Sequence, residues 1–328
     1  MRIMKQIRRR DFLLRHAYNF LPHLTLFKVF NLILNIFEKK YKISTPRSLP
    51  LYLKIEPTPL CQLRCPGCRQ SIGSYKKHFR KDMKISLDDF KRIVNPLRRG
   101  LLGISLSNHG EPLLHENISS LIAYAHKMNI AVSFPSNLSM KLDKSSINKL
   151  VKSGLDSILV SLDGASDETY SKYRVGGKFS LVLNNVRSIS DAKRKYNIKR
   201  PKIIWKFVIF DHNEHEIEIV KRKYKEYGFD DYELVPDNRS NANIKERQFH
   251  KASLRNSGQG CIWLWHAMII GWDGEVSPCC THQCFNIGNA ITGNARVIWR
   301  SEAYKALRQG FTTNDRMNSI CKKCMGYE

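Results

Sequence analysis

Three cysteines on one predicted loop constrain this chain more than any other feature of its sequence. Cys61, Cys65 and Cys68 follow a short apolar segment at 51–56 that predicts a strand. Their thiols are therefore expected at the carboxyl end of that strand, where parallel-sheet enzymes carry their chemistry. Three thiolates leave one position of an iron–sulfur cubane or of a zinc site open, and an open position implies chemistry. Spacing alone also permits buried thiols or half of a structural zinc site.

The number of cysteines also indicates metal binding. Nine cysteines among 328 residues are an odd number, and no cleavable secretory signal is recognised, so metal binding is a better explanation than a disulfide scaffold.

The 55 Lys and Arg residues outnumber the 29 Asp and Glu residues and give a formal net charge of +26. Such a charge predicts a partner rich in negative charge, and nucleic acid, anionic lipid or a phosphorylated substrate would each suit it.

The first fifty residues predict a basic amphipathic helix. The segment 21–37 is the most hydrophobic of the chain, but polar residues interrupt it, so it is not expected to span a membrane. The polar positions recur at steps of three or four: Lys28, Asn31, Asn35, Glu38, Lys39 and Lys42. Basic residues flank the helix: Arg8, Arg9, Arg10 and Arg15 on one side, and Lys39, Lys40, Lys42 and Arg47 on the other. Two interpretations stay open, a helix on an anionic bilayer surface or an extension packed on the main domain.

From position 51 onward, apolar runs alternate with amphipathic segments, which predicts strand-helix units and a parallel sheet. Strands are expected at 51–56, 103–107, 131–135, 157–161, 202–209 and 232–235, and helices at 87–97, 117–128, 145–153, 179–196 and 214–227. The predicted class is α/β, with a partial (β/α)6 TIM-like barrel. The domains are expected to be a helical extension at 1–50, the barrel at 51–235, a polar connector at 236–260 and a small cysteine-rich domain at 261–328.

The spacing Cys-x3-Cys-x2-Cys after the first strand resembles that of the radical S-adenosylmethionine (SAM) superfamily. After the second strand, His109-Gly110-Glu111-Pro112 resembles the Gly-Gly-Glu-Pro motif that holds the methionine amino group of SAM, with His109 in place of the first glycine. Segments after the third and fourth strands are similar to further SAM-binding motifs of the family. The resemblance thus assigns SAM contacts to Gly67, Asn108, Gly110, Glu111, Pro112, Ser136, Asn137, Ser161, Asp163 and Arg174.

The last 68 residues add a second resemblance. Cys261, the segment Trp-Asp-Gly-Glu-Val-Ser-Pro-Cys ending at Cys279, and the pair Cys321 and Cys324 resemble the Twitch or shortened SPASM domain of many radical SAM enzymes. These four thiolates are enough to close one auxiliary [4Fe–4S] cluster. Cys280 and Cys284 are expected not to be ligands, although either is a possible substitute, and a zinc knuckle remains an alternative because spacing does not distinguish zinc from iron–sulfur.

The resemblance implies cleavage of SAM to a 5′-deoxyadenosyl radical, started by an electron from a donor such as flavodoxin or ferredoxin. An auxiliary cluster with four cysteine ligands favours an oxidoreductase that is dehydrogenase-, epimerase- or dehydratase-like, as in members that oxidise aminocyclitols. A basic loop at 75–84 suits an anionic group, so the expected substrate is a carbohydrate, polyol or lipid-linked molecule. The catalytic acid or base is not identified. The expected location is the cytoplasm, with the inner face of the membrane as a possible anionic partner surface.

Two other functions are considered. Many SPASM-bearing enzymes modify ribosomal peptides, although such maturases usually carry an N-terminal winged-helix domain that the first fifty residues do not resemble. A zinc-bearing nucleic-acid-binding protein would suit the charge, but no nucleic-acid motif is recognised and the strand-end motifs would have no role.

Overall fold

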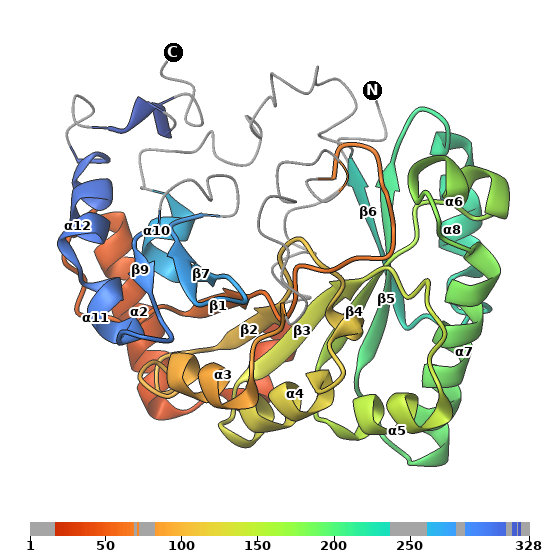
Figure 1. Cartoon of the computed structure of the whole chain (residues 1–328), viewed down its shortest axis with the longest axis horizontal. Coiled ribbons are helices and arrows are strands. Elements are labelled where there is room, and N and C mark those ends of the chain that lie inside the picture. Colours follow the sequence, from red (N-terminus) through yellow and green to blue (C-terminus); the bar gives the residue numbers. More distant parts are fainter. Residues whose placement is uncertain are drawn as a thin grey trace.

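The computed structural model describes residues 17–68, 71, 83–236, 261–279, 286–312, 317–319 and 321–322. Its centre is a nine-stranded sheet in the order β6-β5-β4-β3-β2-β1-β7-β8-β9 (Figure 1). The strands from β6 to β7 are parallel, and β8 and β9 are antiparallel to their neighbours. The first six are β1 (Tyr52–Ile55), β2 (Gly103–Leu106), β3 (Ala131–Ser136), β4 (Ser157–Ser161), β5 (Lys202–Ile209) and β6 (Asp231–Pro236). The predicted partial barrel is therefore confirmed.

Helices connect these strands and cover one face of the sheet (Figure 1). They are α3 (Leu87–Val94), α4 (Ile118–Lys127), α5 (Lys144–Lys152), α6 (Asp167–Tyr173), α7 (Phe179–Lys195) and α8 (Ile217–Lys223). Hydroxyl and carboxylate side chains start several of them: Ser86 caps α3 by accepting from the Asp89 amide, and Asp143 caps α5. Phe90, Phe134 and Trp205 are fully buried between the layers.

Two helix predictions need correction, and one helix was missed. The helix expected at 87–97 ends at Val94, because Pro96 has no backbone N–H and does not donate the next helical hydrogen bond. The helix expected at 214–227 begins with a 3-10 turn at Glu214–Glu216, and α8 ends at Lys223. Helix α6 was not predicted, because its seven residues are too few to show a clear apolar period.

The C-terminal segment continues the barrel sheet. It comprises α10 (Ile262–His266), β7 (Ala267–Ile270), β8 (Glu275–Ser277), β9 (Gly288–Asn289), α11 (Ala295–Trp299) and α12 (Glu302–Gln309). Strand β7 pairs in parallel with β1, from Tyr52 opposite Ala267 to Ile55 opposite Ile270. The core of the barrel extends into this segment through buried Trp265, Met268 and Trp299.

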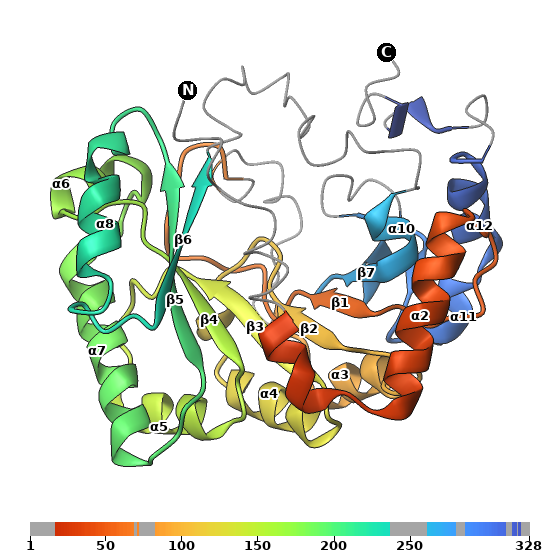
Figure 2. The same ribbon diagram turned by 180° about the vertical axis from the view of Figure 1, so that it is seen from behind.

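Helix α2 (Leu26–Lys40) lies beside α10, α11 and α12 in both views (Figures 1 and 2). It packs on the molecule through its polar side: Lys28, Asn31, Asn35 and Glu38 are buried. Most of its large apolar side chains are exposed to solvent instead, and Leu32 and Leu34 are partly buried. This is the opposite of the usual arrangement, in which an amphipathic helix buries its apolar face. Among the described residues, no helix is long and apolar enough to cross a bilayer.

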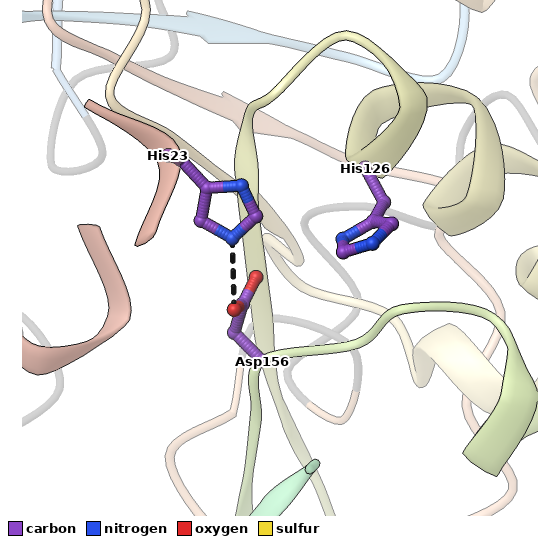
Figure 3. A group of neighbouring side chains, drawn as sticks. All are labelled: His23, His126 and Asp156. Carbon is purple, nitrogen blue, oxygen red and sulfur yellow. Dashed lines mark hydrogen bonds and ion pairs between the residues drawn. The ribbon is translucent and has the colours of Figure 1, made fainter. Parts of the chain in front are cut away.

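A histidine-aspartate cluster fastens the segment before α2 to the amino ends of β3 and β4. Figure 3 shows His23, from a 3-10 turn at Leu21–His23, bonded to Asp156, with the ring of His126 nearby. The His23 Nε2 atom lies 3.0 Å from Asp156 Oδ1. The second Asp156 oxygen accepts from the Val132 amide at 2.8 Å. Arg200 forms an ion pair with the same oxygen that faces His23. Because Arg200 already neutralises this carboxylate, the cluster serves as a structural attachment and not as a cation site.

Candidate active site

The three cysteines of the first motif lie on the loop that leaves the carboxyl end of β1. Leu63 in this loop is buried against Tyr173, Val208 and Phe210, and Cys65 belongs to the same apolar cluster. The amide of Arg64 donates to the Val175 carbonyl at 2.9 Å, which attaches the loop to the end of α6. Packing and backbone hydrogen bonds therefore hold the loop in place.

Side chains from the end of β3 and from the segment after α6 reach these thiols. Asn137, at the end of β3, places its Nδ2 atom 3.8 Å from Cys61 Sγ. Arg174, which follows α6, places Nη1 3.8 Å from Cys65 Sγ. The structure thus brings predicted SAM contacts next to the cysteines. Arg174 and Cys65 are more than a hundred positions apart in the sequence.

Arg174 is held by a buried ion pair. Its Nε and Nη2 atoms lie 2.7 and 2.6 Å from Asp163 Oδ2, and Oδ1 of Asp163 accepts from the Val208 amide at 2.8 Å. Burial lowers the pKa of the guanidinium, but the charges of Asp163 and Cys65 more than offset burial, so the pKa of Arg174 is raised above its ordinary value. Asp163 is fully buried and engaged in these contacts, so its carboxylate orients Arg174.

Glu111 connects three loops of the site. Its carboxylate accepts from Ser136 Oγ at 2.7 Å, from the Asn137 amide at 2.8 Å and from the Leu113 amide at 3.1 Å, while its own amide donates to the Leu60 carbonyl at 2.7 Å. Burial raises the pKa of this carboxyl, and the three hydrogen bonds counteract that rise. Glu111 therefore ties the end of β2 to the end of β3 through its carboxylate and to the cysteine loop through its backbone amide.

The neighbouring glycine allows this close contact. A Cβ atom on Gly110 would lie 2.0 Å from the Thr58 carbonyl oxygen, so no larger residue fits there without moving the chain that leads to Cys61. Pro112 begins a 3-10 turn at Pro112–Leu114 immediately afterwards. Close backbone packing therefore explains the glycine of the motif.

The remaining predicted contacts lie around the same loops. Gly67 has φ of +71° in the turn between Cys65 and Cys68, a backbone conformation that favours glycine. Ser161 is the last residue of β4 and is partly buried. Asn108 Oδ1 is buried and receives no hydrogen bond from any residue that the structure describes. A buried amide oxygen of this kind needs a donor, and a bound ligand would supply one.

Two further residues belong to the site. Glu56, which directly follows β1, is completely buried and accepts from the His109 amide at 2.9 Å. Gln62 donates to Asn137 Oδ1 at 2.8 Å and to the Ser139 carbonyl at 3.0 Å. The sequence offered one signal for each residue: Glu56 directly follows a predicted strand, and Gln62 lies inside the cysteine motif. Neither signal indicated what the residue does.

The donor set fits an iron–sulfur cluster and an amino-acid ligand. Burial raises the pKa of Cys61 to about 12 and also raises that of Cys65, although Arg174 opposes the shift at Cys65. Such thiols need a metal centre to become thiolates. A guanidinium suits a carboxylate ligand, and the acceptor on Asn108 suits an ammonium or hydroxyl group.

The candidate auxiliary site is described in part. Cys261 precedes α10, Cys279 follows β8, and both are partly buried, as is Cys321. Burial raises the pKa of Tyr304 above its ordinary range, and the proximity of Cys279 adds to that effect. Cys324, Cys280, Cys284 and most of the basic loop at 75–84 lie outside the described residues.

Family models match both parts of the chain. The model described as the radical SAM superfamily matches residues 55–222, and the model described as the SPASM iron-sulfur cluster-binding domain matches residues 261–325. Together they cover the barrel and the C-terminal segment in the predicted order.

Curated relatives include two classes of enzyme. The mycofactocin maturase MftC of Mycolicibacterium smegmatis is 27% identical over 143 residues, which covers 44% of this chain and 35% of the maturase. A GTP 3′,8-cyclase of Clostridium acetobutylicum is 30% identical over 157 residues, which covers 46% of each protein. The chain thus spans about a third to a half of the length of these relatives.

Solved structures agree in fold. SuiB of Streptococcus suis, bound to its precursor peptide SuiA, has a TM-score of 0.63 at 16% identity and covers 84% of this chain and 70% of that chain. The enzyme anSMEcpe with bound AdoMet has a TM-score of 0.57 at 16% identity and covers 84% and 88%. These likenesses support the fold of both the barrel and the C-terminal segment.

Proposed function

The chain belongs to the radical SAM superfamily, and from this premise we propose that it is a maturase that modifies a peptide. Its cofactors are SAM, a [4Fe–4S] cluster and auxiliary iron–sulfur in the SPASM segment. We assign the first cluster to Cys61, Cys65 and Cys68, and the auxiliary cluster to Cys261, Cys279, Cys321 and Cys324. When bound, the first cluster and SAM supply the 5′-deoxyadenosyl radical that abstracts hydrogen from the substrate.

The other residues of the site bind SAM or hold its surroundings in place. We propose that Arg174, oriented by Asp163, binds the carboxylate of SAM, and that Asn108 accepts from its polar groups. Glu111 holds the three loops that surround SAM in one arrangement. These contacts preorganise the ligand, so that one substrate C–H bond is placed beside the reactive carbon.

The SPASM match carries the choice of substrate class. Many enzymes with this domain modify ribosomal peptides, and the MftC relative is itself named a maturase. The GTP cyclases are equally similar in sequence, but the SPASM segment favours a peptide.

The proposal is tested with anaerobically reconstituted protein, SAM and a reductant, where 5′-deoxyadenosine is measured with and without small peptides encoded beside the gene. The maturase proposal is supported by a peptide that stimulates 5′-deoxyadenosine formation and whose mass, measured by mass spectrometry, shows a loss of hydrogen. Stimulation by GTP and by no peptide would contradict it. Cys65→Ala is the control and should give no 5′-deoxyadenosine, because it removes a ligand of the first cluster. Flavodoxin or ferredoxin should replace the chemical reductant.

A second candidate is an oxidoreductase acting on a carbohydrate, polyol or anionic lipid-linked substrate. The exposed apolar side of α2 and the net charge of +26 favour it, since both suit a lipid-linked anion. Polyprenyl-phosphate-linked sugars presented in vesicles would then stimulate 5′-deoxyadenosine formation, whereas the candidate peptides would not.

A further inference from the structure

Helix α2 carries a continuous apolar stripe that faces solvent. The side chain of Leu26 is 93% exposed, and that of Ile33 is 64% exposed. The stripe consists of Leu26, Phe27, Val29, Phe30, Ile33, Ile36 and Phe37, whose steps of three and four place them on one side of the helix. An exposed apolar patch of this kind marks an interaction surface.

The opposite side of α2 fixes this orientation. Asn31 accepts from the Leu49 amide at 2.8 Å and donates to the Leu49 carbonyl at 3.1 Å. Asn35 donates to Ser48 Oγ at 2.9 Å and to the Trp265 carbonyl at 2.6 Å. A rotation that buried the apolar stripe would break these buried hydrogen bonds, so the stripe stays outward.

The carboxylate of Glu38 adds a third attachment. It accepts from the backbone amides of Arg47 at 2.6 Å and Ser48 at 3.1 Å, and it is itself buried. The polar side of the helix is therefore satisfied by the protein along three successive turns. What remains available for a partner is the apolar side, together with Lys39 and Lys40 in the last turn.

Arginine-rich pockets border the apolar stripe. One, of about 400 Å³, is lined by Phe27, Phe30, Arg47, Arg98, Arg99 and Arg296 among others. A second, of about 460 Å³, shares Phe27, Arg98 and Arg99 and adds Lys127. Neither is lined by an acidic side chain. Guanidinium groups bind phosphate oxygens well, so the pockets suit lipid phosphate groups at the edge of an apolar contact.

We propose that α2 and these pockets dock the enzyme on an anionic phospholipid bilayer. The apolar side chains would enter the interfacial region, and Arg98 and Arg99 would contact headgroup phosphates. A second copy of this chain is a poorer occupant, because a self-complementary contact would bring the same arginines together in a protein of net charge +26. This inference does not depend on which substrate the active site takes.

Sedimentation of the intact, cluster-loaded protein with vesicles tests the proposal. Binding is expected to vesicles containing phosphatidylglycerol, to fall by about tenfold or more with phosphatidylcholine alone, and to weaken with salt. Phe30→Asp with Ile33→Asp should reduce binding by a similar factor, and Phe30→Leu with Ile33→Leu should retain it. Because both positions are exposed, the fold should survive, and unchanged circular dichroism and SAM cleavage would verify this.

The charge contribution has its own matched pair of variants. Arg98→Glu with Arg99→Glu should abolish the preference for phosphatidylglycerol. The control, Arg222→Glu with Lys225→Glu, makes the same charge change near α8, at the other end of the sheet (Figure 1). This control should have little effect on vesicle binding. Equal loss in both pairs would overturn the pockets as the binding site. Absence of binding by the unmodified protein would overturn the proposal, as would a dimer in lipid-free solution that Phe30→Asp dissociates.

Discussion

At the scale of single residues, the site depends on side chains that hold other groups in place. Glu111 and Asp163 are buried carboxylates whose hydrogen bonds are all made within the protein, to loops or to Arg174. The sequence motifs predicted that both positions belong to one SAM site. The partner of each was not predictable, because a motif gives residue order and not which side chain pairs with which.

Gly110 should tolerate no larger residue. In Gly110→Ala the new Cβ would meet the Thr58 carbonyl oxygen at 2.0 Å and backbone atoms of Pro59, which are not free to move aside. The displaced chain leads to Cys61, so SAM cleavage should fall by about a hundredfold, as for a misplacement of about 1 Å. Production of 5′-deoxyadenosine and iron content measure the effect.

Gly176→Ala is the matched control for this change. Gly176 has a φ of +86°, which strains an alanine, but no atom lies closer than 3.9 Å to its added Cβ. The Gly176→Ala change should lower the free energy of unfolding by about 1–2 kcal/mol through backbone strain and leave SAM cleavage nearly intact. Normal activity in Gly110→Ala would show that the close packing at Thr58 is not needed.

Arg174→Lys should weaken SAM binding while leaving the first cluster in place. A lysine cannot make the paired contacts to Asp163 Oδ2, so the buried carboxylate loses a partner and the ligand loses an oriented cation. Breaking such a pair costs about 2–5 kcal/mol. The KM for SAM should therefore rise at least about thirtyfold, with unchanged iron content. An unchanged KM would remove Arg174 from the set of ligand contacts.

At the scale of elements, the strands were predictable and the orientation of α2 was not. Each barrel strand lies within one residue of its expected ends, because buried parallel strands read as apolar runs. The periodicity of α2 was also correct. It could not reveal which face packs inward, because the partners of Asn31 and Asn35 are backbone groups whose positions depend on the tertiary fold.

The junction of α2 with α10 should make stability depend on pH. Burial, together with the charge of Lys39, lowers the pKa of His266 to about 4, below the unfolded value near 6.5. Between these values the unfolded chain binds one more proton than the folded chain, so the free energy of unfolding falls as pH falls. The full effect at pH near 4 is about 3 kcal/mol.

Urea unfolding of the wild type and of His266→Gln at pH 7 and pH 5 isolates this contribution. Both proteins share every other titrating group, so only the wild type should show the additional loss of stability at the lower pH. Parallel behaviour of the two proteins would mean that His266 is protonated in the folded state and that its burial is not costly.

At the scale of the whole molecule, the barrel and the auxiliary segment form one sheet. The resemblance to the SPASM domain predicted that the segment from 261 onward binds iron–sulfur, and the family model agrees, but cysteine spacing carries no information on strand pairing. The parallel pairing of β7 with β1 turns the first barrel strand into an interior strand. The indoles of Trp265 and Trp299 add hydrogen bonds of 2.9 and 3.0 Å to the carbonyls of Ile43 and Ser48.

Deleting residues 261–328 should therefore damage the barrel itself. The deletion exposes the edge of β1, removes buried Trp265 and Met268, and leaves Asn35 without the Trp265 carbonyl. An exposed edge of this length, next to lost core, favours aggregation, so the shortened protein should be recovered poorly and bind little iron. Cys261→Ala with Cys321→Ala in the full chain provides the contrast: it should fold, and its iron content should fall from about eight to about four. A shortened protein that remained monomeric and cleaved SAM at the normal rate would show that the continuous sheet is not required for the barrel.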